Sequence, residues 1–534
     1  MNKWLFVFFV FLVFSCQSKP QWSDVPPSQF IQVSGQQFVG NDQEFIIKAI
    51  AFGNQIWENP TYSSKIMHHQ EIDYTRVRKM GFNSVRFYLS EALFQKDGFD
   101  WLDKNIAWAK KAGVFLLLNM HYPPGGYQSN GKGDALWLEK SNQDRLVKLW
   151  KSIAKRYAKE EQILGYGLVN EPVPVGSYKA WKNLAQRLIV EIRDEDPWHI
   201  LFVERALYLK NSVEPYSLTA SFPLVKDPGP RQNIVLEYHH YDPLEFTHQG
   251  AEWVPGLQLA DTQYPDPNHV IQNAMSWKGT TSNTSTLQSN SDWKFLEGEV
   301  FEWNIDSSVI VKPAIQFENL GKNGQGWIRN LAVERVMDEG PHQVVWKMDA
   351  FIPNHWGFWS KDGNGRLVTQ QSPTSSAEVL GTTSDANITW LGDPLALMKG
   401  RRYRISGWVK AQNLGSRALI RLRLDQYEKM SKYEVWDKKY VFETLKPILE
   451  IGKARNQPVF LGEFGTIAKS FQNNRGGDRW VKDMLEILKE NKLSFSYHAY
   501  HEPAFGLYTS WNTFPQDDEK NQTLEKLFIE ELQD

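Results

Sequence analysis

Short apolar runs alternate with amphipathic stretches along most of the chain, and this alternation limits the fold more than any other feature. The first runs are EFIIKAIAFG at residues 44–53, NSVRFYL at 83–89 and VFLLLNMHY at 114–122. The stretches between them have the apolar spacing of helices, and two of these stretches end at Gly81 and Gly113. Strands that alternate with helices predict a parallel sheet covered by helices.

Five further runs bring the number of expected strands to eight. They are ILGYGLVNEP (163–172), HILFVE (199–204), NIVLEYHHYDP (233–243), PVFLGEFG (458–465) and LSFSYHAYHEP (493–503). Eight is the number that a closed (β/α)8 TIM barrel requires, and such barrels carry their active sites at the C-terminal ends of the strands. The sequence therefore predicts an α/β barrel built from two parts, residues 30–275 (strands 1–6) and 427–534 (strands 7–8).

The helical spacing disappears between residues 276 and 426. A Ser/Thr/Asn-rich stretch, SWKGTTSNTSTLQSNSD (276–292), is typical of a linker. Short alternating runs follow, and in RYRISGWVKA (402–411) the residues Tyr403, Ile405 and Val409 face one way. This period of two predicts an inserted all-β sandwich, jelly-roll-like, between strands 6 and 7.

The N-terminus has the layout of an exported protein. In MNKWLFVFFVFLVFSC (1–16), Lys3 precedes an apolar run too short to span a bilayer, as in a secretory signal. Cys16 is the only cysteine, and with the loose segment 17–29 after it, it resembles a bacterial lipoprotein cleavage site. We therefore expect a protein secreted across the inner membrane and held by a lipid anchor in the cell envelope, at the outer membrane or cell surface. An ordinary secreted protein with an incidental cysteine is the alternative.

The amino-acid composition limits which kinds of partner and cofactor can be expected. The chain has 60 basic and 62 acidic residues, a net charge of −2, and no basic block, so no nucleic-acid partner is expected. It is rich in aromatic residues (22 Trp, 20 Tyr, 30 Phe), which suits a protein that stacks on sugar rings as well as one with a large core. No cofactor or metal is predicted, because the MHH and YHH triplets lack partner ligands at the usual spacing. The oligomeric state stays open.

Polar residues lie at or just past the ends of five expected strands. They are Arg86, His121, Asn170 with Glu171, His239 with Tyr241, and Glu463. In a barrel these ends converge on one cleft, where two carboxylates would face each other. Hydrolysis of a glycosidic bond requires such a pair, one protonated acid and one ionised carboxylate.

The neighbours suggest how the two roles are divided. Arg86 beside Glu463 would keep that carboxylate ionised, and Tyr241 could donate a hydrogen bond to it. Glu171, partly desolvated near His239, is expected to have a raised pKa and to protonate the leaving group. Asn170 could bind the sugar 2-hydroxyl.

Two other carboxylates lie near strands five and six. Glu204 and Glu237 are interpreted as structural groups.

These residues give the chain a resemblance to glycoside hydrolase family 5, the cellulase-like group of retaining (β/α)8 hydrolases. The motifs are GFNSVRFYL, LLLNMHYPPGG, GLVNEP, YHHYDP and PVFLGEFG. The resemblance implies that Glu171 is the acid/base and Glu463 the nucleophile, with a polysaccharide as substrate. One departure is that strand eight offers His498 and Tyr500 where the family usually places a tryptophan beneath the sugar.

The insert resembles the jelly-roll carbohydrate-binding modules of bacterial polysaccharidases, with its strand order permuted. Trp356 and Trp359 could form a sugar platform there or pack in its core. We therefore predict a lipid-anchored retaining glycoside hydrolase acting on β-linked glucan, mannan or a related polysaccharide. Transglycosylation would use the same residues, and a non-catalytic glycan-binding lipoprotein is a further alternative that the presence of both glutamates disfavours.

Overall fold

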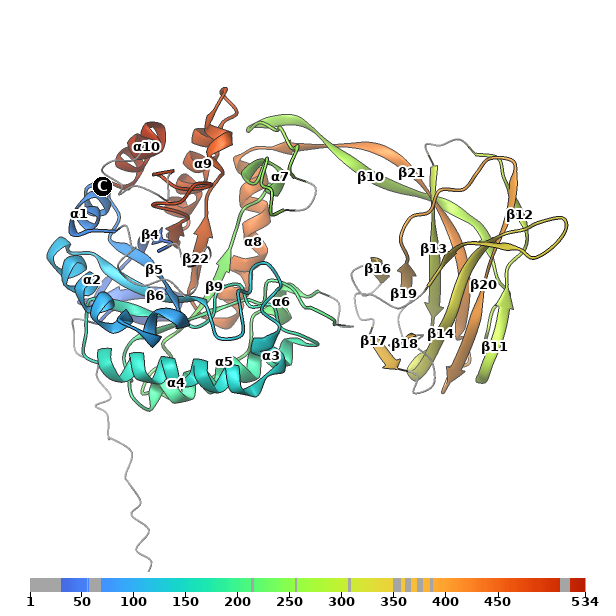
Figure 1. Cartoon of the computed structure of the whole chain (residues 1–534), viewed down its shortest axis with the longest axis horizontal. Coiled ribbons are helices and arrows are strands. Elements are labelled where there is room, and N and C mark those ends of the chain that lie inside the picture. The colour runs from blue at the N-terminus through green and yellow to red at the C-terminus, as the bar shows by residue number, and fades with distance from the viewer. Residues whose placement is uncertain are drawn as a thin grey trace, which may run out of the picture.

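The structure of the protein is a computed structural model that describes most of the chain. It covers residues 30–54, 56, 69–212, 216–254, 257–305, 309–348, 357–360, 366–371, 378–384, 388–509 and 519–533. The segment 1–29 with Cys16 and the expected platform residue Trp356 lie outside these ranges, as does the side chain of Trp359. Figure 1 shows two bodies, a barrel and a β-sandwich, joined by a long ribbon.

Eight parallel strands form a closed barrel, which confirms the predicted fold. In barrel order they are β4 (Lys48–Phe52), β5 (Ser84–Ser90), β6 (Phe115–Tyr122), β7 (Ile163–Gly167), β8 (Ile200–Glu204), β9 (Ile234–His239), β22 (Val459–Phe464) and β23 (Ser494–Tyr497). The last strand, β23, pairs in parallel with β4 and closes the ring. The carboxyl ends of all eight strands therefore face the same side of the molecule.

Helices surround the barrel and cover its outer face. They are α1 (Glu71–Lys79), α2 (Gly98–Ala112), α3 (Ala135–Leu138), α4 (Lys140–Tyr157), α5 (Tyr178–Arg193), α6 (Leu218–Ser221), α7 (Leu244–Thr247), α8 (Lys438–Arg455), α9 (Gly477–Glu490) and α10 (Gln522–Leu532), with 3-10 turns η2 (Glu91–Gln95) and η4 (Ala468–Phe471).

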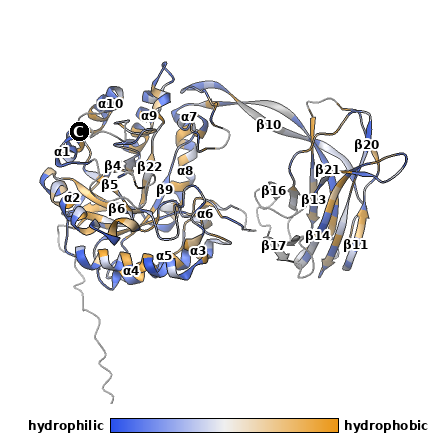
Figure 2. Ribbon diagram, viewed as in Figure 1, coloured by the Kyte–Doolittle hydropathy of each residue, from blue (hydrophilic) through white to orange (hydrophobic). Residues whose placement is uncertain are grey.

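Each long helix buries one apolar face. On α5, Trp181 and Leu188 pack into the main core, and each such side chain contributes about 1.5–3 kcal/mol when fully buried. Figure 2 shows hydrophilic residues on the outward faces of α4 and α5. At Gly113 the chain adopts φ 67° and ends α2, where glycine avoids the steric cost of a left-handed conformation.

A small antiparallel sheet lies at the N-terminal end of the barrel. Its strands are β1 (Gln32–Ser34), β2 (Gln37–Gly40) and β3 (Gln43–Glu44). Ile31 and Phe38 from this segment join Phe202 and Phe460 in a buried cluster. This end of the barrel is filled by apolar side chains, which leaves the opposite end for polar residues.

The insert between β9 and β22 forms two antiparallel sheets. The first sheet has the order β10 (Asp266–Asn283), β21 (Leu419–Trp436), β13 (Val309–Glu318), β19 (Ile388–Leu391) and β16 (Gly357–Ser360). The second has the order β11 (Ser291–Glu297), β20 (Arg401–Gln412), β14 (Gly321–Arg335), β18 (Glu378–Ser384) and β17 (Arg366–Gln371), with β12 (Phe301–Trp303) on β20 and β15 (Gln343–Lys347) on β14. Tyr403, Ile405 and Val409 point into the core between the sheets, as their spacing predicts.

Strands β10 and β21 pair along most of their length and connect the two bodies (Figure 1). Residues 276 and 426, the boundaries expected from the sequence, lie within these two strands. The interpretation of residues 276–292 as a linker is wrong for its first half, because β10 continues to Asn283. Polar side chains suit this ribbon, since Thr280 donates a hydrogen bond to Asp425 Oδ1 at 2.7 Å.

None of the helices in the described part of the chain is long and apolar enough to cross a membrane.

Candidate active site

Seven of the eight side chains singled out in the sequence lie at or just past the C-terminal ends of barrel strands. Arg86 was expected at such an end, but it is the third of the seven residues of β5 and reaches the site from inside the barrel. Arg86 is on β5, His121 on β6, Asn170 and Glu171 follow β7, His239 ends β9 with Tyr241 after it, Glu463 is on β22 and His498 follows β23. The contacts below join all eight into one network. Convergence on one cleft follows from parallel closure, because neighbouring strands end at the same level.

Arg86 lies at the centre of this network and is fully buried. Its Nη1 donates to Glu463 Oε1 at 2.7 Å, its Nη2 to Asn170 Oδ1 at 2.9 Å, and its Nε to Glu237 Oε1 at 3.0 Å. A buried guanidinium is tolerated only when carboxylates and polar oxygens surround it. Arg86 therefore fixes residues from three other parts of the barrel relative to one another.

Glu463 accepts hydrogen bonds on both carboxylate oxygens. Tyr88 donates to Oε1 at 2.6 Å and Tyr241 donates to Oε2 at 2.9 Å. Burial by itself would raise the pKa of Glu463, but the positive charges of His239 and Arg86 act against it, and the pKa is held well below its usual range. Glu463 is thus a buried, ionised carboxylate surrounded by hydrogen-bond donors.

Glu171 contacts His239 instead of Arg86. Its Oε1 lies 2.9 Å from His239 Nδ1, and the same nitrogen lies 3.4 Å from Glu463 Oε2. Because Glu171 Oε1 and Glu463 Oε2 both contact this one nitrogen, the distance between these two oxygens cannot exceed the sum of the two distances. That limit is below the separation of about 6.5–9.5 Å between the carboxyl groups of inverting glycosidases.

The expectation of a raised pKa for Glu171 is wrong. Burial raises it, but the hydrogen bond and the charge of His239 act in the opposite direction and are stronger, so the pKa of Glu171 is lowered. Burial also opposes the charged form of His239, yet the carboxylates of Glu204 and Glu463 raise the pKa of His239 to about 9. At neutral pH the proton of this pair therefore resides on the imidazole.

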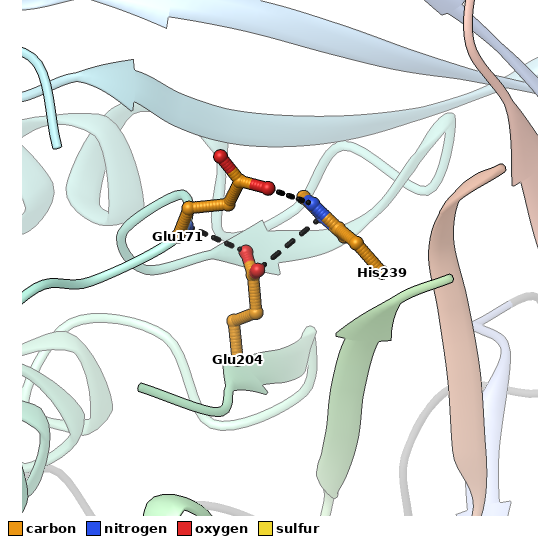
Figure 3. Close-up of side chains that lie close together, drawn as sticks. All are labelled: Glu171, Glu204 and His239. Carbon is orange, nitrogen blue, oxygen red and sulfur yellow. Dashed lines mark hydrogen bonds and ion pairs between the residues drawn. The ribbon is translucent and has the colours of Figure 1, made fainter. Parts of the chain in front are cut away.

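Glu204 and Glu237, interpreted from the sequence as structural groups, lie inside the site. Glu204 ends β8 and pairs in register with Glu237 on β9. Glu204 Oε2 accepts the backbone N–H of Glu171 at 2.9 Å, and its Oε1 lies 3.4 Å from His239 Nε2 (Figure 3). The alternation of a strand provides a signal for Glu237, because residues two apart share a face and Glu237 is two residues before His239.

Tyr88 was also missed. It follows Arg86 by two residues on β5 and so points to the same side. Its ring stacks on His121 with centroids 3.8 Å apart and an interplanar angle of 12°. Burial holds the pKa of His121 well below its usual range, which makes it a neutral ring.

His498 takes part in the network and Tyr500 does not. His498 Nδ1 lies 3.1 Å from the Tyr88 hydroxyl, and its ring is 5.5 Å from that of Phe505. Tyr500 is buried in the main core, where its hydroxyl donates to Asp73 Oδ1 at 2.9 Å. Of the two residues offered in place of a tryptophan, only His498 lies at the site.

One group of side chains has the composition of a metal site. Ligand atoms of Glu171, Glu204 and His239 all lie within 4.8 Å of one another. However, both nitrogens of His239 face carboxylate oxygens at hydrogen-bond or ion-pair distance, and Arg86 Nη2 lies 3.9 Å from Glu204 Oε2. A raised histidine pKa and an adjacent guanidinium favour a bound proton here over a divalent cation.

A closed barrel with two carboxylates at its C-terminal rim, one paired with arginine and one with histidine, is the architecture of a glycoside hydrolase. Comparison with known proteins agrees. The family model described as Cellulase (glycosyl hydrolase family 5) matches residues 41–301.

Curated relatives place the chain in the same family. The chain is 30% identical over 266 residues to Endoglucanase C of Acetivibrio thermocellus, covering 47% of this chain and 71% of that protein. It is 27% identical over 223 residues to Cellodextrinase A of Ruminococcus flavefaciens, covering 40% and 63%. A solved glycoside hydrolase aligns with 16% identity and a TM-score of 0.49, covering 91% of this chain and 99% of that one. The chain belongs to glycoside hydrolase family 5, and it is therefore a retaining glycoside hydrolase.

Proposed function

We propose that the protein hydrolyses β-linked glucan by double displacement, with Glu463 as nucleophile and Glu171 as acid/base. The observation that carries this assignment is the different environment of the two carboxylates. Glu463 accepts hydrogen bonds from Arg86, Tyr88 and Tyr241. Glu171 instead faces the protonated His239. Donors around one carboxylate keep it anionic, and a protonated imidazole beside the other provides a proton.

In the first step a Glu463 oxygen attacks the anomeric carbon while the bond to the leaving oxygen breaks. Oε1 accepts two hydrogen bonds, from Arg86 and Tyr88, whereas Oε2 accepts one, from Tyr241, with His239 Nδ1 at 3.4 Å, so we assign the attack to Oε2. The leaving oxygen takes a proton from Glu171, which the Nδ1–H of His239 can supply across 2.9 Å. Asn170, whose Oδ1 is held by Arg86, is the group that we assign to the sugar 2-hydroxyl.

In the second step water resolves the glycosyl ester. While Glu463 is ionised, its charge raises the pKa of Glu171. Once Glu463 is esterified that charge is gone, so the pKa of Glu171 falls and the group acts as a base toward water. One residue thereby serves as acid and then as base.

The substrate class draws support from the relatives, which are named endoglucanase and cellodextrinase. Purified enzyme should release reducing sugar from β-glucan, and product analysis across β-glucan, mannan and xylan would test this. E463Q is the matched inactive control. Release from mannan or xylan with none from β-glucan would contradict the proposal, and elongated products would indicate transglycosylation.

We infer further that the protein is a lipoprotein of the cell envelope, with the lipid on Cys16. The support is the charged-then-apolar segment before this single cysteine. In cells expressing the full chain, C16A should move the enzyme from the membrane fraction to the soluble fraction and abolish incorporation of labelled fatty acid. Fractionation unchanged by C16A would contradict the anchor.

We also propose that the sandwich binds glycan. Phe295 and Trp408 are direct cross-strand partners on β11 and β20, with ring centroids 5.4 Å apart, on the face opposite the buried Leu296 and Val409. Arg329 on β14 continues this row, 5.5 Å from the Trp408 ring. Flat rings on an outward sheet face offer stacking surfaces for sugar rings.

A further inference from the structure

The backbone at Glu171 has a conformation that few residues adopt. Glu171 has φ 41°, in the left-handed region where residues with a side chain are disfavoured. Its N–H donates to Glu204 Oε2 at 2.9 Å. Because Glu204 is only 2% exposed and ends a barrel strand, this hydrogen bond ties the strained residue to a rigid element.

Glu204 also contacts the far side of His239. Its Oε1 lies 3.4 Å from His239 Nε2, while His239 Nδ1 faces Glu171 Oε1 at 2.9 Å. Figure 3 shows the three side chains as a chain of contacts in which the imidazole lies between two carboxylates. One carboxyl group therefore contacts the candidate acid/base twice, through its backbone and through its proton donor.

We propose that Glu204 is a positioning residue that fixes the backbone of Glu171 and keeps a proton on His239, so that the acid/base glutamate is supplied with that proton in the first step. The inference rests on the proposed role of Glu171. In the step itself the Nδ1–H proton moves to Glu171 Oε1, and from there to the leaving oxygen. His239 keeps its Nε2–H toward Glu204. It regains the Nδ1 proton through Glu171, which takes a proton from the attacking water in the second step.

The charges around the cluster agree with this role. His239 faces Glu204 on β8, Glu463 on β22, Glu171 after β7 and Arg86 on β5. Among the single interactions that raise the pKa of His239, the charge of Glu204 has the largest effect. Burial, together with the charges of Glu237 and Glu171, raises the pKa of Glu204, whereas the positive charge of His239 lowers it. The contact between Glu204 and His239 therefore favours a carboxylate facing a protonated imidazole.

Two substitutions separate the two contacts. In E204Q the amide oxygen can still accept the Glu171 N–H, but the side chain no longer carries a charge or an acidic proton. E204A removes both contacts. E237Q is the matched control, because Glu237 is the buried carboxylate opposite Glu204 in the neighbouring strand and it contacts Arg86 instead of His239.

The assay compares aryl β-glycosides with a poor leaving group (phenol) and a good one (2,4-dinitrophenol) across pH. For E204Q we expect kcat/KM on the phenyl substrate to fall by about 10²-fold, while the dinitrophenyl substrate stays near the parental value. We also expect the basic limb of the profile to move to lower pH, because His239 loses its proton more easily without the neighbouring carboxylate. E204A should lower kcat/KM on both substrates further than E204Q does. E237Q should lower kcat/KM on the two substrates by the same factor and leave the basic limb of the pH profile where it is.

An unchanged basic limb and an unchanged ratio between the two substrates in E204Q would overturn the inference. E171Q, assayed in parallel, separates this failure from that of the proposed function. If E171Q does not discriminate between leaving groups, the role of Glu171 itself is wrong. If E171Q discriminates and E204Q does not, only the role of Glu204 is wrong.

A measurement on the unmodified enzyme covers the case in which E204Q does not fold. In protein labelled with ¹⁵N-histidine, the His239 ring, identified by its loss in H239Q, should be doubly protonated at pH 7. A neutral His239 ring at that pH would overturn the inference.

Discussion

At the scale of single residues, the role of each carboxylate in the site depends on whether it contacts the guanidinium of Arg86 or the imidazole of His239. Arg86 donates to Glu463 and Glu237, and His239 faces Glu171 and Glu204. An arginine keeps its proton under all physiological conditions, whereas a histidine can release one. The carboxylate beside arginine is thus suited to attack, and the one beside histidine to proton transfer.

This division leads to a prediction for the two glutamates. E463A should abolish turnover of every substrate, because no carboxylate remains to attack. E171A should lower kcat on polysaccharide by about 10²–10⁴-fold, yet show a rapid burst of dinitrophenol from an activated aryl glycoside. The burst is expected because the first step needs no acid there, while the second step lacks its base. Stopped-flow absorbance checks this, and a burst in E463A with none in E171A would reverse the assignment.

A second prediction concerns His498, which stands where the family usually has tryptophan. Its ring contacts Tyr88 and Phe505, and an imidazole offers one donor and one acceptor where an indole offers a flat apolar face. H498W should therefore change the ratio of kcat/KM between gluco- and manno-configured substrates. Y500F, which alters a core tyrosine, is the control and should leave the ratio unchanged. An equal loss on both epimers in H498W would show that His498 only packs.

The candidate residues could be predicted from the sequence because strand ends of a parallel barrel converge. What the sequence did not provide was the sign of the pKa shift at Glu171. That sign depends on how many carboxylates surround His239, and Glu204 and Glu463 reach it from strands far apart in the chain. Burial at the strand end favoured a raised pKa for Glu171, whereas the contact with His239, which is distant in the sequence, lowers it.

At the scale of elements, the ribbon formed by β10 and β21 is the part of the fold that the sequence pattern did not predict. Residues 276–283 are rich in Ser and Thr, which also occur in linkers, but here they form a ladder with β21. Cross-strand partners decide between the two structures, and those partners lie about 150 residues later, at 423–428. By contrast, the alternation in β20 is local, and it predicted the buried face correctly.

The outward face of the second sheet gives a third prediction. In the E463Q background, replacing both Phe295 and Trp408 with alanine should weaken binding to insoluble polysaccharide by about tenfold, because each ring contributes about 0.5–1.5 kcal/mol beyond its burial. Y433A, which removes another exposed aromatic ring, on the ribbon, is the matched control. Pull-down of the full chain measures the binding. Parental affinity in the double variant would exclude this face as the glycan site.

At the scale of the whole molecule, the ribbon places the sandwich beside the barrel while leaving the barrel strands continuous (Figure 1). Trp277 and Tyr427 are cross-strand partners on the ribbon, so residues 278–426 can be replaced by Asn-Gly, which favours a two-residue hairpin turn. The barrel core and the sandwich core share no residues. The shortened enzyme is therefore expected to fold and to retain its activity on aryl glycosides and short oligosaccharides.

Its activity on long or insoluble polymer should fall, because binding energy from sugar units far from the cleavage point is lost. The ratio of polymer to oligosaccharide activity, measured for the parent, the shortened enzyme and the Phe295/Trp408 double variant, separates two roles for the insert. If the double variant matches the shortened enzyme, the outward aromatic face accounts for the contribution of the sandwich. If the shortened enzyme hydrolyses polymer as well as the parent does, the sandwich is a spacer and does not guide the substrate.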